Sequence, residues 1–446
     1  MASTLTTAAP VTTRNRIQSL DVLRGVALFG ILLINITGFG LPHAYSDPTV
    51  YGGSEGINLW TWGTMTLLFE GTQRGIFSIL FGAGFILLTS RLEAAGRTDA
   101  ADIYYRRTIW LVIFGLIHSY LLLWTGEILF YYGVTALFLF PLRRLAPRAL
   151  LALALAGILV GAIWSAVDAW ETVEILEKSQ IARAVQADGG ELTSEQEDDL
   201  EAWTDIEESY KPDKATLTED IEAHKGSYLD VLTHQAEDNA EDESWGIYRY
   251  FFDFFSMMLV GMALFKLGVL DLRRPARVYW VMVIAGYTVG LAINAYEMKI
   301  LLQDEFSVIA FLNSDWTYDL GRMAMTVGHL GVLLLFCRSG WLGWLQRSLA
   351  AVGRMALSNY VSHSLICAFI FYGFGLGLYG DLQRYQLYYV VVAIWAFQLI
   401  ASPLWLRHFR FGPLEWIWRW LTYLERPALR RRPADGGGPV QAAQPA

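Results

Sequence analysis

The sequence predicts an all-α membrane protein: a polytopic transmembrane helical bundle with an acidic helical insert outside the membrane. Apolar residues make up 54% of the 446 residues and fall in long runs. A run of about 20 apolar residues is long enough to cross a hydrocarbon core of ~30 Å. The basic residues lie mostly in the loops between these runs. They are concentrated in every second loop, which places them on the same side of the membrane. These observations exclude a soluble enzyme.

The apolar runs predict about ten crossings. They cover residues 20–40, 59–90, 108–124, 127–141, 149–167, 248–265, 278–297, 319–337, 355–374 and 387–405. The run 59–90 is too long for one upright helix and too short for two. Glu70 and Arg74 interrupt it beside glycines, so we expect a tilted or interfacial helix over 59–70 and a crossing from about 74 to 90.

The loops divide the basic residues unequally. If the N-terminus is inside, the inner segments carry 23 Lys and Arg, and the short outer loops carry only Lys299 and Arg384. Because inner loops are enriched in Lys and Arg, both termini are expected in the cytoplasm of a bacterial cell, with the protein in its inner (plasma) membrane.

An acidic insert separates the two halves of the bundle. Residues 168–245 contain 24 Asp and Glu against 5 Lys and Arg. Thr193 and Gln196 form a capping-box pattern, which predicts helices lying over the outer mouth. The insert is either a lid or partner-docking surface, or simply a solvated acidic loop. Its charge argues against nucleic acid as a partner.

The remaining divisions follow from composition. Residues 407–423 mix arginines with Trp and Tyr, which predicts an interfacial amphipathic helix. Cys337 and Cys367 lie in apolar segments and indicate neither a disulfide nor a metal site, so no metal is expected. The predicted parts are an N-terminal tail (1–19), two five-crossing halves (20–167 and 246–406), the insert (168–245), an interfacial helix (407–429) and a disordered tail (430–446).

The first apolar run carries a polar stripe. Asp21, Arg24 and Asn35 fall within about 60° of one another on a helix, and His43 follows the run. Charged groups in hydrocarbon cost a few kcal/mol each, so the stripe should face protein, water or a ligand. Either Asp21 and Arg24 form a pair at the membrane entrance, or the stripe is one wall of a functional cavity.

Polar side chains also enter three later runs, and together they predict a hydrated cavity between the first, third, eighth and ninth crossings. Arginines in such a cavity suit anionic groups, because the guanidinium can bind two oxygens at once. Taken singly, each of these residues is more simply explained by hydrogen bonds between helices. The candidate substrate-binding residues are Arg24, Arg322, His329, Asn359, His363, His118 and Glu127.

Several motifs resemble the YeiB family of bacterial membrane proteins of unknown function. They are LDVLRG (20–25), FSILFGAGF (77–85), FGLIHSY (114–120), GEIL (126–129), GRMALSNY (353–360) and FGPLEWIWR (411–419). The resemblance covers nearly the whole chain and implies a polytopic helical fold, but no settled activity.

A looser resemblance concerns the first run alone. LDVLRGVAL, followed by Asn35 and His43, is similar to the start of transmembrane acyltransferases of the heparan N-acetyltransferase type. This resemblance implies that His43 is the catalytic histidine and Asn35 its polar helper. It also implies acyl-CoA, most simply acetyl-CoA, as the cytoplasmic co-substrate.

Acyl transfer fits the chemistry of these residues. Histidine can act as a base near neutral pH, and an amide can donate to a developing oxyanion. Arg24 and His43 are 19 residues apart, roughly 28 Å along a helix, so an extended CoA arm would bridge part of this span. The acceptor would be a small molecule or glycan at the outer face, and the sequence permits a homo-oligomer in the lipid bilayer.

Two other function classes stay open. A transporter or flippase for an anionic metabolite or lipid would use the same arginines and histidines, although the chain shows no convincing internal repeat. A non-enzymatic scaffold would bind a partner through the acidic insert.

The predicted topology can be tested by cysteine labelling, in a chain whose native cysteines are replaced by serine. An impermeant thiol reagent added to intact cells should label Leu200→Cys in the insert and leave Ala443→Cys in the tail unlabelled. The opposite pattern would contradict the topology.

Overall fold

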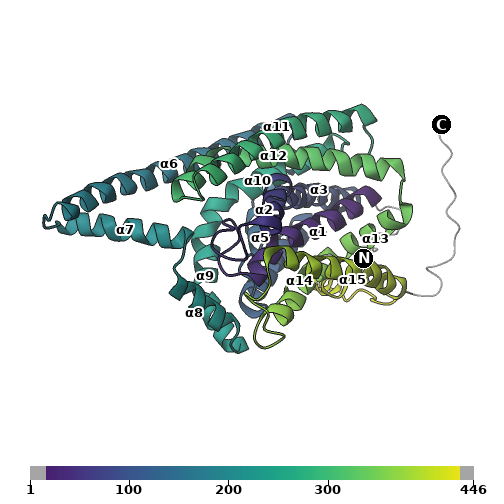
Figure 1. The fold of residues 1–446 in the computed structure, drawn as a ribbon. Helices are drawn as coiled ribbons and strands as arrows, with labels where there is room; N and C mark the ends of the chain where they lie inside the picture. The colour runs from purple at the N-terminus through teal and green to yellow at the C-terminus, as the bar shows by residue number, and fades with distance from the viewer. Residues whose placement is uncertain (1–16, 432–446) are drawn as a thin grey trace.

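The computed structural model describes residues 17–431, and this part of the chain is a bundle of helices with a single isolated β-bridge between Phe409 and Arg430 (Figure 1). Most of the predicted N-terminal tail and nearly all of the predicted C-terminal tail lie outside these residues. The all-α fold class predicted from the apolar runs is confirmed.

The N-terminal half holds a long first helix, a broken second segment and several shorter helices. Its elements are α1 (Gln18–Gly40), α2 (Gly56–Leu68), α3 (Thr72–Ala94), α4 (Ala100–Leu116), the π-helix η2 (Ile117–Leu121), α5 (Leu129–Ala136), the 3₁₀-helix η3 (Phe140–Arg144) and α6 (Pro147–Ala187). The break between α2 and α3 falls at 69–71, where Gly71 adopts a φ of 64° that favours glycine. The predicted interruption of the run 59–90 at Glu70 is therefore present.

The insert is helical throughout most of its length, and the C-terminal half follows it. The insert continues α6 and adds α7 (Ser194–Tyr210), α8 (Lys214–His224), α9 (Tyr228–Glu241) and the π-helix η4 (Asp242–Gly246). The second half consists of α10 (Ile247–Lys266), α11 (Ala276–Gln303), α12 (Val308–Ser339), α13 (Gly343–Arg354), α14 (Ala356–Phe371), α15 (Arg384–His408) and α16 (Pro413–Tyr423).

Within residues 17–431, six helices or helix pairs are long and apolar enough to cross a membrane, and a bent pair ending in α10 makes a seventh. The other three predicted crossings coincide with the shorter helices α4, α5 and α14. The exposed residues support a membrane location. On α6, for example, Ile163 is 64% exposed and Trp164 52% exposed, as expected of side chains that contact lipid.

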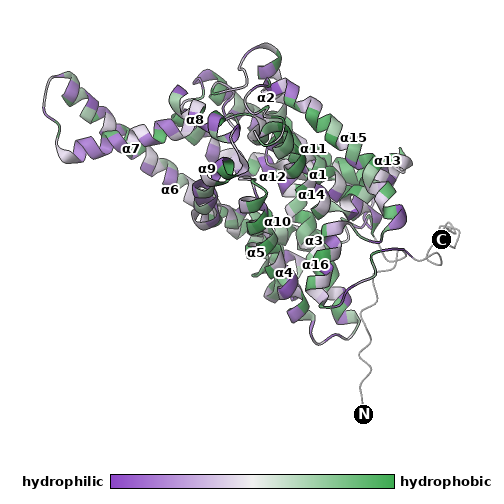
Figure 2. Ribbon diagram, turned by 90° about the horizontal axis from the view of Figure 1, so that it is seen from below, coloured by the Kyte–Doolittle hydropathy of each residue, from purple (hydrophilic) through white to green (hydrophobic). Residues whose placement is uncertain are grey.

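Polarity separates the bundle from the insert. Figure 2 shows hydrophobic residues gathered in the bundle, whereas α7 and the end of α6 beside it are largely hydrophilic. The capping box predicted at the start of α7 is present, with Thr193 and Gln196 each accepting a hydrogen bond from the other's backbone N–H. Trp203 on α7 is buried against Val308 and Leu312 of α12, so this hairpin packs on the bundle.

The helix α1 passes through the middle of the bundle and approaches α13 closely (Figure 1). A Cβ atom added to Gly25 would lie 2.2 Å from the carbonyl oxygen of Leu349. A Cβ added to Gly353 would lie 1.9 Å from the carbonyl oxygen of Asp21. Only glycine allows this approach, so the glycines of LDVLRG and GRMALSNY hold the two helices together.

A buried charge cluster joins α3, α10 and α12. Asp253 on α10 accepts two hydrogen bonds from Arg322, at 2.5 and 3.1 Å, and lies 3.3 Å from Nη2 of Arg74. Arg322 also contacts Asp319 at 2.7 Å. Because Arg322 is 2% exposed, its charge needs both carboxylates.

Removal of the central carboxylate should destabilise the bundle. We expect Asp253→Asn to lower the free energy of unfolding by about 3–5 kcal/mol, because it leaves buried guanidinium charge uncompensated. Thermal unfolding in detergent measures the effect. The matched control is Asp381→Asn, whose carboxylate pairs with Lys225 at an exposed position and should contribute no more than about 1 kcal/mol. Equal melting temperatures for the two variants would contradict the prediction.

Candidate functional site

Two cavities enter the bundle from its two ends. The first has a volume of about 390 Å³ and is lined by the C-terminal part of α1, including Asn35; we call it the Asn35 cavity. The second, of about 650 Å³, is lined by the N-terminal part of α1, including Arg24; we call it the Arg24 cavity. Ile31 and Ile128 line both cavities, so these side chains separate one from the other.

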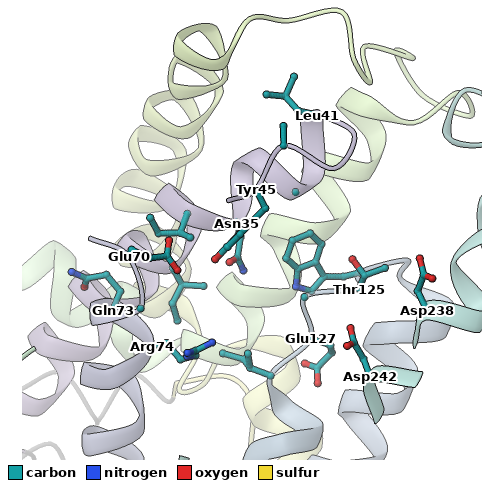
Figure 3. Close-up of a pocket in the computed structure, with 18 of the residues that line it drawn as sticks. Asn35, Leu41, Tyr45, Glu70, Gln73, Arg74, Thr125, Glu127, Asp238 and Asp242 are labelled. Atoms are coloured by element: carbon teal, nitrogen blue, oxygen red, sulfur yellow. The ribbon is translucent and has the colours of Figure 1, made fainter. Parts of the chain in front are cut away.

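The Asn35 cavity brings together three of the residues predicted from sequence: Asn35, His43 and Glu127. Figure 3 shows Asn35 between two groups of polar side chains, with Glu70 and Arg74 on one side and Glu127 on the other. His43 lies just beyond the end of α1 and is exposed, with a φ of 47°. It therefore stands at the mouth, open to a ligand that enters from this end.

Carboxylates dominate the charge of the Asn35 cavity. The acidic side chains that line it are Glu70, Glu127, Asp220, Asp238 and Asp242. Arg74 is the single arginine in this lining, and Asp253 already compensates its charge. The cavity therefore favours neutral or cationic groups over anions.

Glu127 is held in place from several directions. Its carboxylate accepts hydrogen bonds from the backbone N–H groups of Leu129 and Phe130, both at 2.7 Å, at the start of α5. It also accepts from Nδ1 of His118 at 3.1 Å. With that proton on Nδ1, Nε2 of His118 accepts from the hydroxyl of Ser364 at 2.7 Å. His118 and Ser364 are each 1% exposed and line neither large cavity, so this array positions the carboxylate.

The Arg24 cavity has the opposite charge. Six arginines line it, against the two carboxylates Asp21 and Glu415. The arginines are Arg24, Arg91, Arg97, Arg107, Arg354 and Arg419. Asp21 and Arg24 form the predicted pair, with Nη1 and Oδ1 3.2 Å apart, and both also line the cavity. The two interpretations of the polar stripe are therefore compatible.

The helix α16 closes one side of the Arg24 cavity. Glu415 accepts hydrogen bonds from the backbone N–H groups of Leu357 and Ser358, at 2.7 and 3.1 Å, at the start of α14. The indole of Trp418 donates to the carbonyl of Arg107 at 2.9 Å, and the Arg107 guanidinium lies 3.5 Å from the Trp418 ring centroid. The predicted interfacial helix over 407–429 thus packs on the bundle and contributes to a binding surface.

The remaining predicted residues lie outside both large cavities. Arg322 belongs to the charge cluster around Asp253. Asn359 donates to the hydroxyl of Ser402 at 3.0 Å, and His363, 2% exposed, contacts Gln398 at 3.0 Å. His329 lies between the rings of Phe69 and Tyr287. We expected one cavity between the first, third, eighth and ninth crossings, but the structure has two separate large cavities. These four predicted residues line neither of them and instead contact neighbouring helices.

The sequence did not single out most of the residues that line the cavities. Arg74 stood out as a charge within an apolar run, but its neighbours across the cavity, Asp238 and Asp242, belong to the insert. Arg107, Arg354 and Arg419 come from three inner segments far apart in the sequence. Only the packing of α4, α13 and α16 brings them together, so no local pattern could reveal them.

Comparisons with known proteins agree on a family. A family model described as a protein of unknown function (DUF418) matches residues 264–425. The uncharacterized protein YeiB of Escherichia coli (strain K12) is 32% identical over 411 residues, which are 91% of this chain and 95% of the relative. The uncharacterized protein YxaH of Bacillus subtilis (strain 168) is 28% identical over 444 residues, 95% of this chain and 98% of the relative. No solved structure matches the chain.

Proposed function

Since the chain belongs to the YeiB family of membrane proteins of unknown function, we propose its activity from its cavities: transfer of an acyl group from cytoplasmic acyl-CoA to an acceptor across the membrane. The observation that carries this proposal is the pair of oppositely charged cavities divided by Ile31 and Ile128. The Arg24 cavity would face the cytoplasm, with both termini, in a bacterial inner membrane. The Asn35 cavity would face the acceptor.

The Arg24 cavity suits the phosphate groups of CoA. Guanidinium groups bind phosphate oxygens two at a time, and six of them converge here, five from five different helices and Arg97 from the loop between α3 and α4. Its volume of about 650 Å³ falls in the range of pockets for small organic ligands. The segments LDVLRG, FSILFGAGF, GEIL, GRMALSNY and FGPLEWIWR all contribute to its lining, so five of the six motifs that resemble the YeiB family lie at this one cavity.

The thioester end of the bound molecule would pass between Ile31 and Ile128 to reach Asn35. The acceptor oxygen or nitrogen attacks the thioester carbonyl carbon, and its proton passes to the neutral imidazole of His43. The Asn35 side-chain amide donates to the oxygen that becomes negative in the tetrahedral intermediate. The carbon–sulfur bond then breaks, its electron pair leaves with the CoA sulfur, and the sulfur takes the proton from the imidazolium.

His118 and Glu127 are positioning residues in this scheme. The Glu127 carboxylate holds the end of the segment 122–128 against the start of α5, through the N–H groups of Leu129 and Phe130, and against His118. This segment carries Ile128 and Trp124 into the cavity walls. The charge of the Asn35 cavity suits a neutral hydroxyl or an amine as the acceptor, which fits a glycan or a small metabolite.

The first test concerns His43. A His43→Ala protein should fold and bind CoA, and should lose transfer of labelled acetyl groups to periplasmic or membrane material by about 10²–10⁴-fold, the usual effect of losing an acid–base group. The control is His408→Ala, an exposed histidine at the end of α15 that lines neither cavity. Full transfer by His43→Ala would disprove the assignment of His43 as the base. A wild-type protein that neither binds CoA nor transfers acyl groups would disprove the proposed acyltransferase activity.

The second test separates binding from transfer at the junction of the cavities. Ile128→Trp should fill the passage, so CoA binding to the Arg24 cavity should persist while acyl transfer falls strongly. Ile128→Val keeps the passage open and should retain most of the activity. If acyl-CoA binds but an anionic ligand crosses the membrane intact in reconstituted vesicles, the protein is a transporter, the alternative that the same arginines allow.

A further inference from the structure

The helices α8 and α9 bring two histidines and a carboxylate together above the Asn35 cavity. Asp220 and His224 are four residues apart on α8 and so share one face, and His234 faces them from α9. Nε2 of His234 lies 2.8 Å from Oδ1 of Asp220, and Nδ1 of His224 lies 3.0 Å from the same oxygen. Nδ1 of His224 also lies 2.8 Å from the backbone carbonyl oxygen of Asp220, a hydrogen bond that a metal on this nitrogen would replace. One ligand atom from each residue lies within 4.8 Å of the other two.

We propose that Asp220, His224 and His234 bind a divalent transition-metal ion of the zinc type. Two imidazoles and one carboxylate are the ligand set that such ions prefer when a fourth position stays open. In a tetrahedral site with bonds of 2.0–2.1 Å, neighbouring ligand atoms are about 3.3 Å apart. The nitrogens of His224 and His234 need to move only a few tenths of an ångström from Asp220 Oδ1 to reach this separation. The two nitrogens must reach the same separation from each other, starting from no more than 4.8 Å.

The surrounding residues already form the outer shell of such a site. The hydroxyl of Tyr379 donates to the second oxygen of Asp220 at 2.8 Å, and its ring stacks on His224 with centroids 4.1 Å apart. Outer-shell hydrogen bonds of this kind orient the ligands of metal sites. They also keep Oδ1 of Asp220 turned toward the two histidines.

Gln235 supplies a second, independent observation. Its side chain is 3% exposed, its Nε2 lies 2.9 Å from Nε2 of His224, and its Oε1 is buried without a hydrogen-bond partner. A metal on Nδ1 of His224 requires a proton on Nε2, and that N–H requires an acceptor. Rotation of the Gln235 amide by 180° places its oxygen against this N–H as the acceptor. The Gln235 nitrogen then gives up its present contacts with Nε2 of His224 and, at 3.3 Å, with the hydroxyl of Tyr372.

The charge of the site also favours a cation. The insert around it carries 24 acidic and 5 basic side chains, and Asp220 and His224 line the Asn35 cavity, so an open metal position would face that cavity.

A metal here would fasten α8 to α9 within the insert, beside the loop that carries Tyr379. Asp220 and His224 belong to α8, His234 to α9, and Tyr379 to the loop between α14 and α15. The carbonyl of His224 already accepts a hydrogen bond from the backbone N–H of Gly373 at 2.9 Å, at the start of the same loop. Metal binding should therefore raise the stability of the folded chain, and this inference does not depend on acyl transfer.

Zinc titration of the full-length protein in detergent, purified without a polyhistidine tag and stripped with chelator, tests the proposal. Calorimetry should show one Zn²⁺ per chain, and Zn²⁺ should raise the melting temperature. Since loss of an outer-shell partner alone costs 10–100-fold in affinity, His234→Ala and Asp220→Asn should each weaken binding by more than about 100-fold. Co²⁺ in place of Zn²⁺ should give the visible absorption of a tetrahedral site in the wild type and not in these two variants.

His408→Ala is the matched control and should bind Zn²⁺ like the wild type. The melting temperature in chelator shows whether His234→Ala is folded, and the 31% exposure of the His234 side chain makes this replacement tolerable. A wild-type protein that binds no Zn²⁺, or tight binding that survives both His234→Ala and Asp220→Asn in folded protein, would overturn the proposal.

Discussion

The fold depends on one constraint: a charge within the hydrocarbon layer must find an opposite charge, a ligand or water. Asp253 meets this constraint for two arginines at once, and it thereby fixes α3, α10 and α12 relative to one another. Both Arg74 and Arg322 therefore have a structural role, whether or not a ligand also binds them. The arginines of the charge cluster face carboxylates. The Arg24 cavity is lined by six arginines against two carboxylates, and of these six only Arg24 lies in a predicted crossing, whereas the other five come from inner segments.

The sequence allowed the fold class and most helix positions to be predicted, because length and apolar character are local properties. The interruption near Glu70 was predicted for the same reason, since a charge and glycines within an apolar run are visible locally. The candidate site was predicted only in part. Asn35 lies on α1 and His43 just beyond the end of this helix, so the pattern of polar residues along a single helix was enough to identify them.

The rest of the site depends on packing that no local pattern encodes. Arg322, His329, Asn359 and His363 looked like cavity residues because each is polar within an apolar run. In the structure, Asn359 and His363 contact Ser402 and Gln398, so a polar partner on α15 removes the need for a ligand. Gly25 and Gly353 are the opposite case, because they have no reactive side chain and nevertheless shape the site. They allow α1 and α13 to come into contact at the wall of the Arg24 cavity.

The two ends of α1 connect these observations to function. One helix presents Arg24 to a basic cavity and Asn35 to an acidic one, and about 16 Å of helix, 11 residues at ~1.5 Å each, separates them. An anion is attracted to the first cavity and repelled from the second, so a phosphate-bearing donor would stop at Ile31 and Ile128 while a neutral acyl end continues. A carrier for whole anions would need positive charge along the entire path. The reversal of charge at the junction therefore favours group transfer over transport of the intact donor.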